Sequence, residues 1–157
     1  MVMEYNILKI FPQDVSNGEG IRVSVWCSGC SHNCKGCHNP ETAKKHQGTP
    51  LSEELIERIL KMCEPFYIKG LTISGGDPLD IKLKNYEGTM ILCKRFKEKF
   101  PEKDVWVWTG ENYEDLKSEW LNDIDVVIDG EFKQELKDIS LQWRGSSNQR
   151  VIRIIKG

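Results

Sequence analysis

Four of the chain's six cysteines fall close together, at Cys27, Cys30, Cys34 and Cys37. Thiolates at such short spacing bind zinc or an iron–sulfur cluster. Two ligand sets fit the spacing: two Cys-x2-Cys pairs, or the triplet Cys30-x3-Cys34-x2-Cys37 with Cys27 left over. A disulfide framework is disfavoured, because a chain of 157 residues is long enough to bury a core without one. The cysteines therefore indicate metal or redox chemistry.

A four-thiolate zinc site does not fit this spacing. Zinc ribbons separate their two Cys-x2-Cys pairs by about a dozen residues or more, whereas only three residues separate the pairs here. A ferredoxin-type cluster needs a fourth cysteine. Cys63 and Cys93 are available, but both fall in helical patterns, where a cysteine more often packs as a small hydrophobic residue. We expect both to be core residues.

A glycine pair, Gly75 and Gly76, follows the run of residues 71–74. Paired glycines at the carboxyl end of a strand let the backbone approach a ligand closely. A plain turn is the alternative, because Gly-Gly and Asp-Pro are common turn formers. Asp77 comes next, and we expect it to orient a ligand's ammonium group or to cap the following helix rather than to act as a general base.

These motifs must be positioned by strands and helices. Runs rich in β-branched and aromatic residues predict six strands, at residues 5–10, 21–26, 70–74, 104–108, 124–128 and 151–155. A helix is predicted to begin at Ser52 as N-cap and to end before Pro65, with an apolar stripe that includes Leu55 and Ile59. Further helices are predicted at residues 86–100 and 112–120.

The order of these elements predicts the fold. Strands that alternate with helices imply right-handed crossovers and a mainly parallel sheet, with the active site at the carboxyl ends of the strands. The chain is too short for a closed eight-stranded barrel of about 250 residues. We expect an α/β fold, a partial (open) TIM-like barrel of about six mainly parallel strands with flanking helices. Residues 1–157 are expected to form a single domain, since no linker or repeat divides them.

The composition excludes several classes of protein. Hydrophobic residues make up 39% and charged residues 29% of the chain, which is typical of a folded rather than a disordered protein. No apolar run approaches the roughly 18 residues of a membrane helix, and the first residues lack a secretion signal. We therefore expect a cytoplasmic protein with no membrane partner. The formal net charge of -2 argues against nucleic acid as a partner.

Six sequence blocks together resemble one family. They are residues 17–22 (NGEGIR), 29–40 (GCSHNCKGCHNP), 74–79 (SGGDPL), 105–110 (VWVWTG), 125–132 (DVVIDGEF) and 143–150 (WRGSSNQR). These blocks are similar to those of the anaerobic ribonucleoside-triphosphate reductase activating proteins, which are glycyl-radical activating enzymes of the radical S-adenosylmethionine superfamily. The cysteine and glycine blocks are shared with other glycyl-radical activators, whereas DGEF and WRGSSNQR are specific to this family.

The resemblance implies two cofactors, a [4Fe-4S] cluster and S-adenosyl-L-methionine. The expected cluster ligands are Cys30, Cys34 and Cys37. Three thiolates leave the fourth iron open for the amino and carboxylate groups of S-adenosylmethionine, and Cys27 is then expected to pack nearby. The residues expected to contact S-adenosylmethionine are Gly36, Cys37, His38, Gly75 and Gly76. No side chain beyond the cluster is expected to be catalytic.

The resemblance also implies a reaction and its partners. A one-electron donor such as reduced flavodoxin reduces the cluster, and reductive cleavage of S-adenosylmethionine then yields methionine and a 5′-deoxyadenosyl radical. This radical takes a hydrogen from a glycine of the large subunit of anaerobic (class III) ribonucleotide reductase. A homodimer is left open. The alternatives are an activator of another glycyl-radical enzyme such as pyruvate formate-lyase, a non-enzymatic iron–sulfur electron carrier and a zinc-stabilised interaction module.

Three charged or titratable residues of the loops remain. His32 has no partner evident in the sequence, so we expect a solvated side chain. Arg144 and Arg150 flank a polar run, and they are expected either to face the partner protein or the adenosyl end of the cofactor, or to belong to a solvated loop before the last strand.

Overall fold

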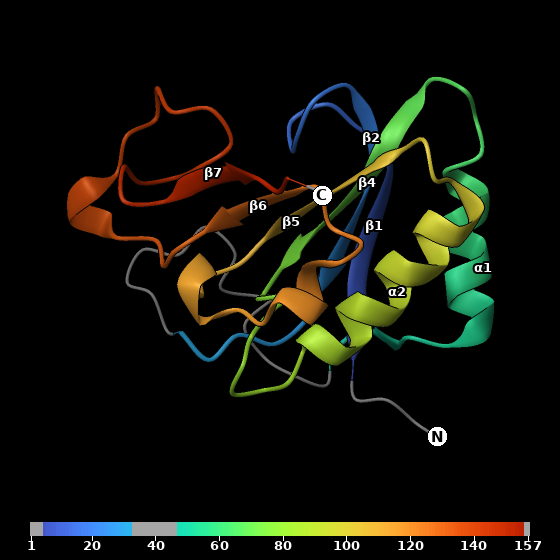
Figure 1. Cartoon of the computed structure of the whole chain (residues 1–157), viewed down its shortest axis with the longest axis horizontal. Helices are drawn as coiled ribbons and strands as arrows, with labels where there is room; N and C mark the ends of the chain where they lie inside the picture. The colour runs from blue at the N-terminus through green and yellow to red at the C-terminus, as the bar shows by residue number, and fades with distance from the viewer. Residues whose placement is uncertain (1–4, 33–46, 156–157) are drawn as a thin grey trace.

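The computed structural model describes residues 5–32 and 47–155. Its central feature is an open sheet of seven strands in the order β3-β1-β2-β4-β5-β6-β7 (Figure 1). The strands are β1 (Asn6–Asp14), β2 (Ile21–Cys27), β3 (Thr49–Pro50), β4 (Ile68–Gly75), β5 (Asp104–Trp108), β6 (Val126–Asp129) and β7 (Arg150–Arg153). All six predicted strands are present. The two-residue β3 was missed because a Thr-Pro pair carries almost no strand signal.

Only the four central strands run parallel. β2, β4, β5 and β6 pair in parallel, whereas β1 and β3 on one side and β7 on the other pair antiparallel. The α/β class is confirmed and the sheet is open, as expected, but a TIM-like barrel of about six mainly parallel strands is not confirmed, because the seven-stranded sheet is mixed. Parallel neighbours need a crossover, usually a helix. The β1–β2 turn is too short for such a crossover, and these neighbours pair antiparallel; the β6–β7 loop also contains no α-helix and returns antiparallel, whereas β5 and β6 are parallel across two short 3-10 helices.

Two of the predicted helices are confirmed. α1 (Glu53–Met62) begins after Ser52, whose Oγ accepts a hydrogen bond from the Leu55 N–H at 3.1 Å. α2 (Tyr86–Lys99) lies between β4 and β5 in the chain and ends just before Pro101, as the sequence predicts. In the described part of the chain, no helix combines the length and apolar character needed to cross a membrane.

The third predicted helix, at residues 112–120, is wrong. This segment forms two short 3-10 helices instead, Tyr113–Asp115 and Ser118–Leu121. Leu116, between them, has an extended backbone (ψ 136°), which breaks the helical path. The break lets both Leu116 and Trp120 reach the core, where Trp120 stacks on Tyr86 with ring centroids 4.0 Å apart. Tertiary packing therefore overrides the local helical pattern.

The two faces of the sheet differ in what covers them. α1 and α2 pack on one face, which we call the helix face, and its strand residues are apolar and buried. They include Val23, Val25, Leu71, Ile73, Val105 and Val107. Alternate residues of a strand point to opposite faces. The other face, which we call the open face, therefore carries the polar and aromatic residues Arg22, Ser24, Trp26, Thr72, Ser74, Trp106 and Trp108.

The loop between β1 and β2 folds over the open face and buries Arg22 completely. The Arg22 guanidinium pairs with Asp104 at 2.6 Å, and it donates to Thr72 Oγ1 at 2.7 Å and to the Glu19 carbonyl at 2.9 Å. Gly18 has a φ of +114°, and a Cβ there would lie 2.8 Å from Arg22 Cδ. The NGEGIR block thus fastens this loop to the sheet, through an arginine whose charge is balanced by Asp104 and whose N–H groups bond to Thr72 and to the loop.

Candidate functional site

A cavity of about 470 Å³ lies on the open face, beside the carboxyl ends of the parallel strands. Its volume is in the usual range for small-molecule sites, about 300–1,000 Å³. The described residues that line it are Asn17, Trp26, Cys30, His32, Ser74, Gly75, Gly76, Trp108, Thr109, Gly110, Gly130, Phe132, Trp143, Arg144, Gly145 and Gln149. Each of the six sequence blocks therefore contributes to a single cavity.

The cysteine loop leaves β2 at this cavity. Cys30 is half-buried and lines it. Two backbone hydrogen bonds join the start of this loop to the glycine block: the Gly76 N–H donates to the Cys27 carbonyl at 2.9 Å, and the Asp77 N–H donates to the Gly29 carbonyl at 2.8 Å. The remaining expected site residues of this loop lie outside the described residues; they are Cys34, Gly36, Cys37 and His38.

Gly75 and Gly76 line the cavity, as a ligand-binding role requires. Gly75 also has a structural reason to be glycine. Its φ is +118°, and a Cβ there would collide with the Cys27 carbonyl oxygen. The glycine pair therefore brings the end of β4 against the end of β2, with the cysteine loop attached to both strands.

Three cysteines lie in the apolar core of the helix face: Cys27, Cys63 and Cys93. Burial raises the pKa of the Cys27 thiol well above its ordinary value, and it raises the pKa of the Cys63 thiol to about 12. A raised pKa disfavours the thiolate, which is the form that binds metals. The predicted core positions of Cys63 and Cys93 are confirmed, and Cys27 packs among apolar side chains on the side of the sheet away from the cavity.

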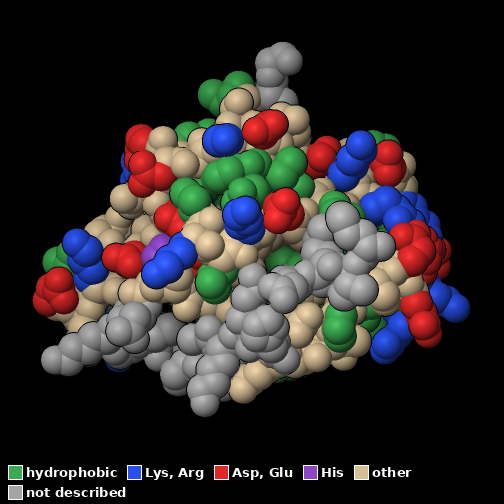
Figure 2. Space-filling view, turned by 90° about the horizontal axis from the view of Figure 1, so that it is seen from below, with side chains coloured by type: hydrophobic (Ala, Val, Ile, Leu, Met, Phe, Trp, Pro, Cys, Tyr) green, Lys and Arg blue, Asp and Glu red, His purple; other side chains and the backbone are tan. Residues whose placement is uncertain are grey.

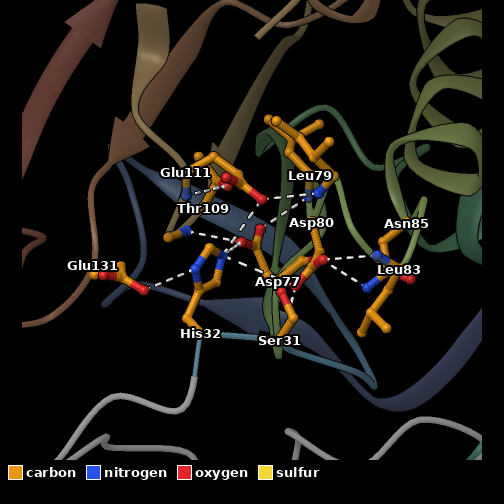
Figure 3. A network of polar contacts seen from close by, with 12 residues as sticks. Ser31, His32, Asp77, Leu79, Asp80, Leu83, Asn85, Thr109, Glu111 and Glu131 are labelled. Carbon is orange, nitrogen blue, oxygen red and sulfur yellow. Dashed lines mark hydrogen bonds and ion pairs between the residues drawn. The ribbon is translucent and has the colours of Figure 1, made fainter. Parts of the chain in front are cut away.

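The expectation of a solvated His32 is wrong. Its side chain is only 10% exposed, although it lies on the loop two residues after Cys30. Its Nε2 lies 2.5 Å from Asp77 Oδ2, and its Nδ1 lies 3.0 Å from Glu131 Oε2 (Figure 3). Glu111 Oε2 is 3.6 Å from the same Nε2. The ring is therefore surrounded by carboxylates that come from after β4, β5 and β6.

These carboxylates favour the protonated imidazole. The hydrogen bond that the imidazole donates to the Asp77 carboxylate raises the pKa of His32 to about 9, although burial opposes the charged form. Burial, in turn, raises the pKa of Glu111, while the N–H of Ile81 lowers it. Figure 2 shows a histidine side chain at the surface with acidic and basic side chains beside it.

The Asp77 carboxylate accepts hydrogen bonds from groups of the protein itself. It is fully buried, and its Oδ1 accepts from the Leu79 N–H at 2.9 Å. Its Oδ2 accepts from the Gly110 N–H at 3.0 Å and also bonds to His32. Its expected role as a helix cap is wrong, since α2 begins at Tyr86, well beyond it. Asp77 is also not among the cavity-lining residues, so its expected role toward an ammonium group has no geometric support.

Aromatic side chains and one arginine form the far side of the cavity. The Trp108 Nε1–H donates to the Trp143 carbonyl at 2.7 Å, which ties the WRGSSNQR block to β5. Arg144 is the only Lys or Arg among the described residues that line the cavity. Its Nη1 donates to the Gln149 carbonyl at 2.9 Å, but its buried Nε has no hydrogen-bond partner within the described protein. This N–H is available to an acceptor that the described residues do not provide.

Arg150 has a different role from Arg144. Its guanidinium lies 2.5 Å from the buried carboxylate of Asp129 and 2.8 Å from that of Glu114. It therefore anchors the start of β7 and does not line the cavity. The neighbouring Gln149 donates from Nε2 to the Gly130 carbonyl at 2.9 Å, which holds the WRGSSNQR and DGEF blocks together.

Sequence reasoning missed that His32 lies among Asp77, Glu111 and Glu131. The signal was present in part: one histidine lies between two cysteines of the proposed triplet, and the acidic residues Asp77, Glu111 and Glu131 each follow a strand shortly after its end. Only the sheet order, which places β4, β5 and β6 side by side, shows that these positions meet.

Comparisons with known proteins agree with this geometry. Residues 16–152 match the family described as 4Fe-4S single cluster domain. The chain is 41% identical over 155 residues to the anaerobic ribonucleoside-triphosphate reductase-activating protein of Pasteurella multocida, and the match covers 94% of this chain and 97% of the relative. The chain belongs to this family. Proteins of the same name from Haemophilus influenzae (42% identical over 153 residues) and Vibrio cholerae (39% over 153) are each matched over 94% of this chain and 97% of their own length.

Membership of this family confirms the resemblance read from the six blocks and accounts for the cysteine loop. The matched domain is one that holds a single 4Fe-4S cluster, so the chain is an iron–sulfur protein and not a zinc module. Thiolates are the usual ligands of such clusters. Cys30, at the cavity, is a described cysteine in the appropriate position to supply one.

Proposed function

We propose that this chain is the activating enzyme of an anaerobic (class III) ribonucleotide reductase. The relatives' names state this activity for those proteins, at about 40% identity over nearly their full length. The single observation that supports it most strongly is the cavity, which is lined by residues from all six sequence blocks. The enzyme would generate a glycyl radical on the reductase's large subunit.

Cys30, Cys34 and Cys37 are the proposed ligands of the [4Fe-4S] cluster. The packing of Cys27 in the helix-face core supports the triplet over two Cys-x2-Cys pairs. Three protein thiolates leave one iron open, as three protein ligands leave a position open in catalytic zinc sites. When bound, the cluster supplies one electron, which cleaves S-adenosylmethionine to methionine and a 5′-deoxyadenosyl radical. No side chain beyond the cluster is required to act as an acid or base.

The lining residues fit S-adenosylmethionine. Gly75 and Gly76 offer unhindered backbone for its methionine end, and Gly36, Cys37 and His38 are proposed to flank it from the cysteine loop. The buried, unpartnered Nε–H of Arg144 fits a carboxylate, which the methionine part supplies. The indole rings of Trp108 and Trp143 give the cavity an apolar wall, which excludes water from a reactive radical.

The open sheet fits a reaction with a macromolecular partner. The residues that line the cavity come from an open face that neither α-helix covers. A glycine of the reductase must reach the deoxyadenosyl carbon, and we propose that the larger partner completes the active site. A one-electron donor such as reduced flavodoxin would reduce the cluster, and the reaction would take place in the cytoplasm. Residues 1–157 would form one domain, and the protein would act as a monomer or a homodimer.

Anaerobic reconstitution tests the proposed reaction. The protein is loaded with iron and sulfide, reduced with dithionite and mixed with S-adenosylmethionine, and 5′-deoxyadenosine is measured by chromatography. The proposal requires 5′-deoxyadenosine from the wild-type protein and from Cys63→Ala, the matched cysteine control, but none from Cys30→Ala, Cys34→Ala or Cys37→Ala. A fully loaded and reduced cluster that leaves S-adenosylmethionine intact would favour the electron-carrier alternative instead.

A further inference from the structure

His32 lies inside the segment that bears the proposed cluster ligands, between Cys30 and Cys34. We propose that His32 is a positioning residue: it fixes the cysteine loop, and with it the cluster, against the ends of β4, β5 and β6. This inference rests on the proposed function only in taking Cys30 and Cys34 as ligands. Groups that hydrogen-bond to metal ligands typically change metal affinity by about 10–100-fold when they are removed, and a residue that holds the ligand-bearing segment acts on the same ligand geometry.

The first contact is with the end of β4. His32 Nε2 bonds to Asp77 Oδ2, and Asp77 is fully buried with its other oxygen held by the Leu79 N–H. A carboxylate fixed at both oxygens cannot follow the histidine if the loop moves. Ser31, the preceding residue, donates its N–H to Asp80 Oδ2 at 2.7 Å, so the loop is attached to the SGGDPLD segment at two successive residues (Figure 3).

The second contact is with the end of β5. Gly110 donates its N–H to the same Asp77 Oδ2 that binds His32. A Cβ on Gly110 would lie 2.6 Å from His32 Cδ2 and 2.9 Å from His32 Nε2. Gly110 is not among the glycines with positive φ, so its backbone conformation is open to other residues. The missing side chain therefore makes room for the His32 ring.

The third contact is with the end of β6. His32 Nδ1 lies 3.0 Å from Glu131 Oε2, and the Glu131 carbonyl accepts from Asn148 Nδ2 at 2.8 Å. The imidazole thus links the cysteine loop to the DGEF block and, through Glu131, to the WRGSSNQR block. With both ring nitrogens engaged, the ring has one orientation. A histidine that stabilised only the local turn of its loop would not contact residues that follow three separate strands.

Iron retention tests this role without S-adenosylmethionine. The proteins are reconstituted anaerobically, and iron release to a chelator is timed while the reduced cluster is recorded by electron paramagnetic resonance. His32→Ala should release iron about tenfold faster or more, with an altered cluster spectrum. His32→Gln should recover much of the wild-type behaviour, because its amide N–H can reach the position of Nε2 and donate to Asp77.

Two further variants separate positioning from stability. Gly110→Ala should also speed iron release, but it should add little in a His32→Ala background, since the ring that it displaces is then absent. Ile59→Val, on α1 in the helix-face core, lowers stability without touching the loop, and it should retain iron like the wild type.

The outcomes are distinct. Equal iron release from wild type and His32→Ala would overturn the inference, as would additive effects of Gly110→Ala and His32→Ala. Fast release from Ile59→Val would also overturn it, because global stability would then control cluster retention. Failure of the wild-type protein to form 5′-deoxyadenosine would count against the proposed function alone, since iron retention is measured without that reaction.

Discussion

The two faces of the sheet are built from the same strands and serve different ends. On the helix face, β2, β4 and β5 place Val25, Ile73 and Val107 against α1 and α2. On the open face, the neighbouring positions hold Trp26, Ser74 and Trp108 around the cavity. One face supplies stability through apolar burial, and the other gives up that burial to hold polar, aromatic and backbone groups where a cofactor can bind.

The comparison is sharpest in the cysteines. Cys27 ends β2 with its side chain in the helix-face core, and Cys30, three residues later, lines the cavity on the open face. The two cysteines therefore lie on opposite sides of the sheet, and only Cys30, on the open face, is a proposed cluster ligand. The predictions below test whether stability and cofactor binding can be changed separately, from the largest expected effect to the smallest.

Phe96→Ala should destabilise the packing of the helix face. Phe96 is fully buried on α2 beside Phe100, so its removal should lower the free energy of unfolding by about 3–5 kcal/mol. Urea unfolding measures the change, and the exposed Lys94→Ala on the same helix is the control, with a change within about 0.5 kcal/mol. Formation of 5′-deoxyadenosine per folded, loaded protein should stay unchanged. A loss of turnover at full loading would contradict the separation of the two faces.

Arg22→Met should lower the stability of the protein and also disturb the open face. It removes the fully buried arginine of an ion pair with the half-buried Asp104, and the hydrogen bond that holds the β1–β2 loop, so the free energy of unfolding should fall by about 3 kcal/mol. Because Asn17 of that loop lines the cavity, binding of S-adenosylmethionine should weaken as well. Calorimetric unfolding and equilibrium binding measure the two effects. A lower stability with an unchanged affinity for S-adenosylmethionine would show that the loop does not support the cavity.

Arg144→Met should act mainly on the cavity, although it also removes the hydrogen bond to the Gln149 carbonyl. Loss of a charge-assisted hydrogen bond to the methionine carboxylate should raise the Kd for S-adenosylmethionine about tenfold, which corresponds to about 1.4 kcal/mol. Isothermal titration of the loaded protein measures it. Arg150→Met is the matched control: it should lower the melting temperature through the loss of the Asp129 pair and leave the Kd unchanged. Equal affinities of wild type and Arg144→Met would remove the arginine from the site.

Ser52→Ala should have the smallest effect, and only on the helix face. Loss of the hydrogen bond from the Leu55 N–H should cost about 1 kcal/mol of stability. Chemical denaturation measures this change, with Ser52→Asp, another favourable N-cap, as the variant that keeps stability. Cofactor binding should be equal in all three proteins, and a difference would indicate that α1 influences the cavity.

Much of the helix face could be predicted from the sequence. The cap at Ser52, the stripe through Ile59 and the six strand patterns are local signals, and each produced the expected element. The antiparallel edges and the split of residues 112–120 depend on tertiary contacts, such as the stacking of Trp120 on Tyr86, which no local pattern contains. The TIM-like barrel of mainly parallel strands is not confirmed for the same reason, because the sequence does not show that β1, β3 and β7 pair antiparallel.

The open face was less predictable. Gly75, Gly76 and Cys30 could be identified because their spacing carries chemical meaning, and the structure places all three at the cavity. His32 could not, because its partners Asp77 and Glu131 are 45 and 99 residues away along the chain. Such contacts depend on strand order, and the sequence alone leaves that order open.

The central claim is that the open face generates a radical on a partner's glycine. The most direct test mixes the reconstituted, reduced protein and S-adenosylmethionine with the large subunit of the anaerobic reductase, and records the electron paramagnetic resonance spectrum. We predict a glycyl radical doublet on the reductase that is lost with Cys30→Ala and retained with Cys63→Ala. A loaded wild-type protein that cleaves S-adenosylmethionine and yet leaves the reductase without a radical would contradict the account.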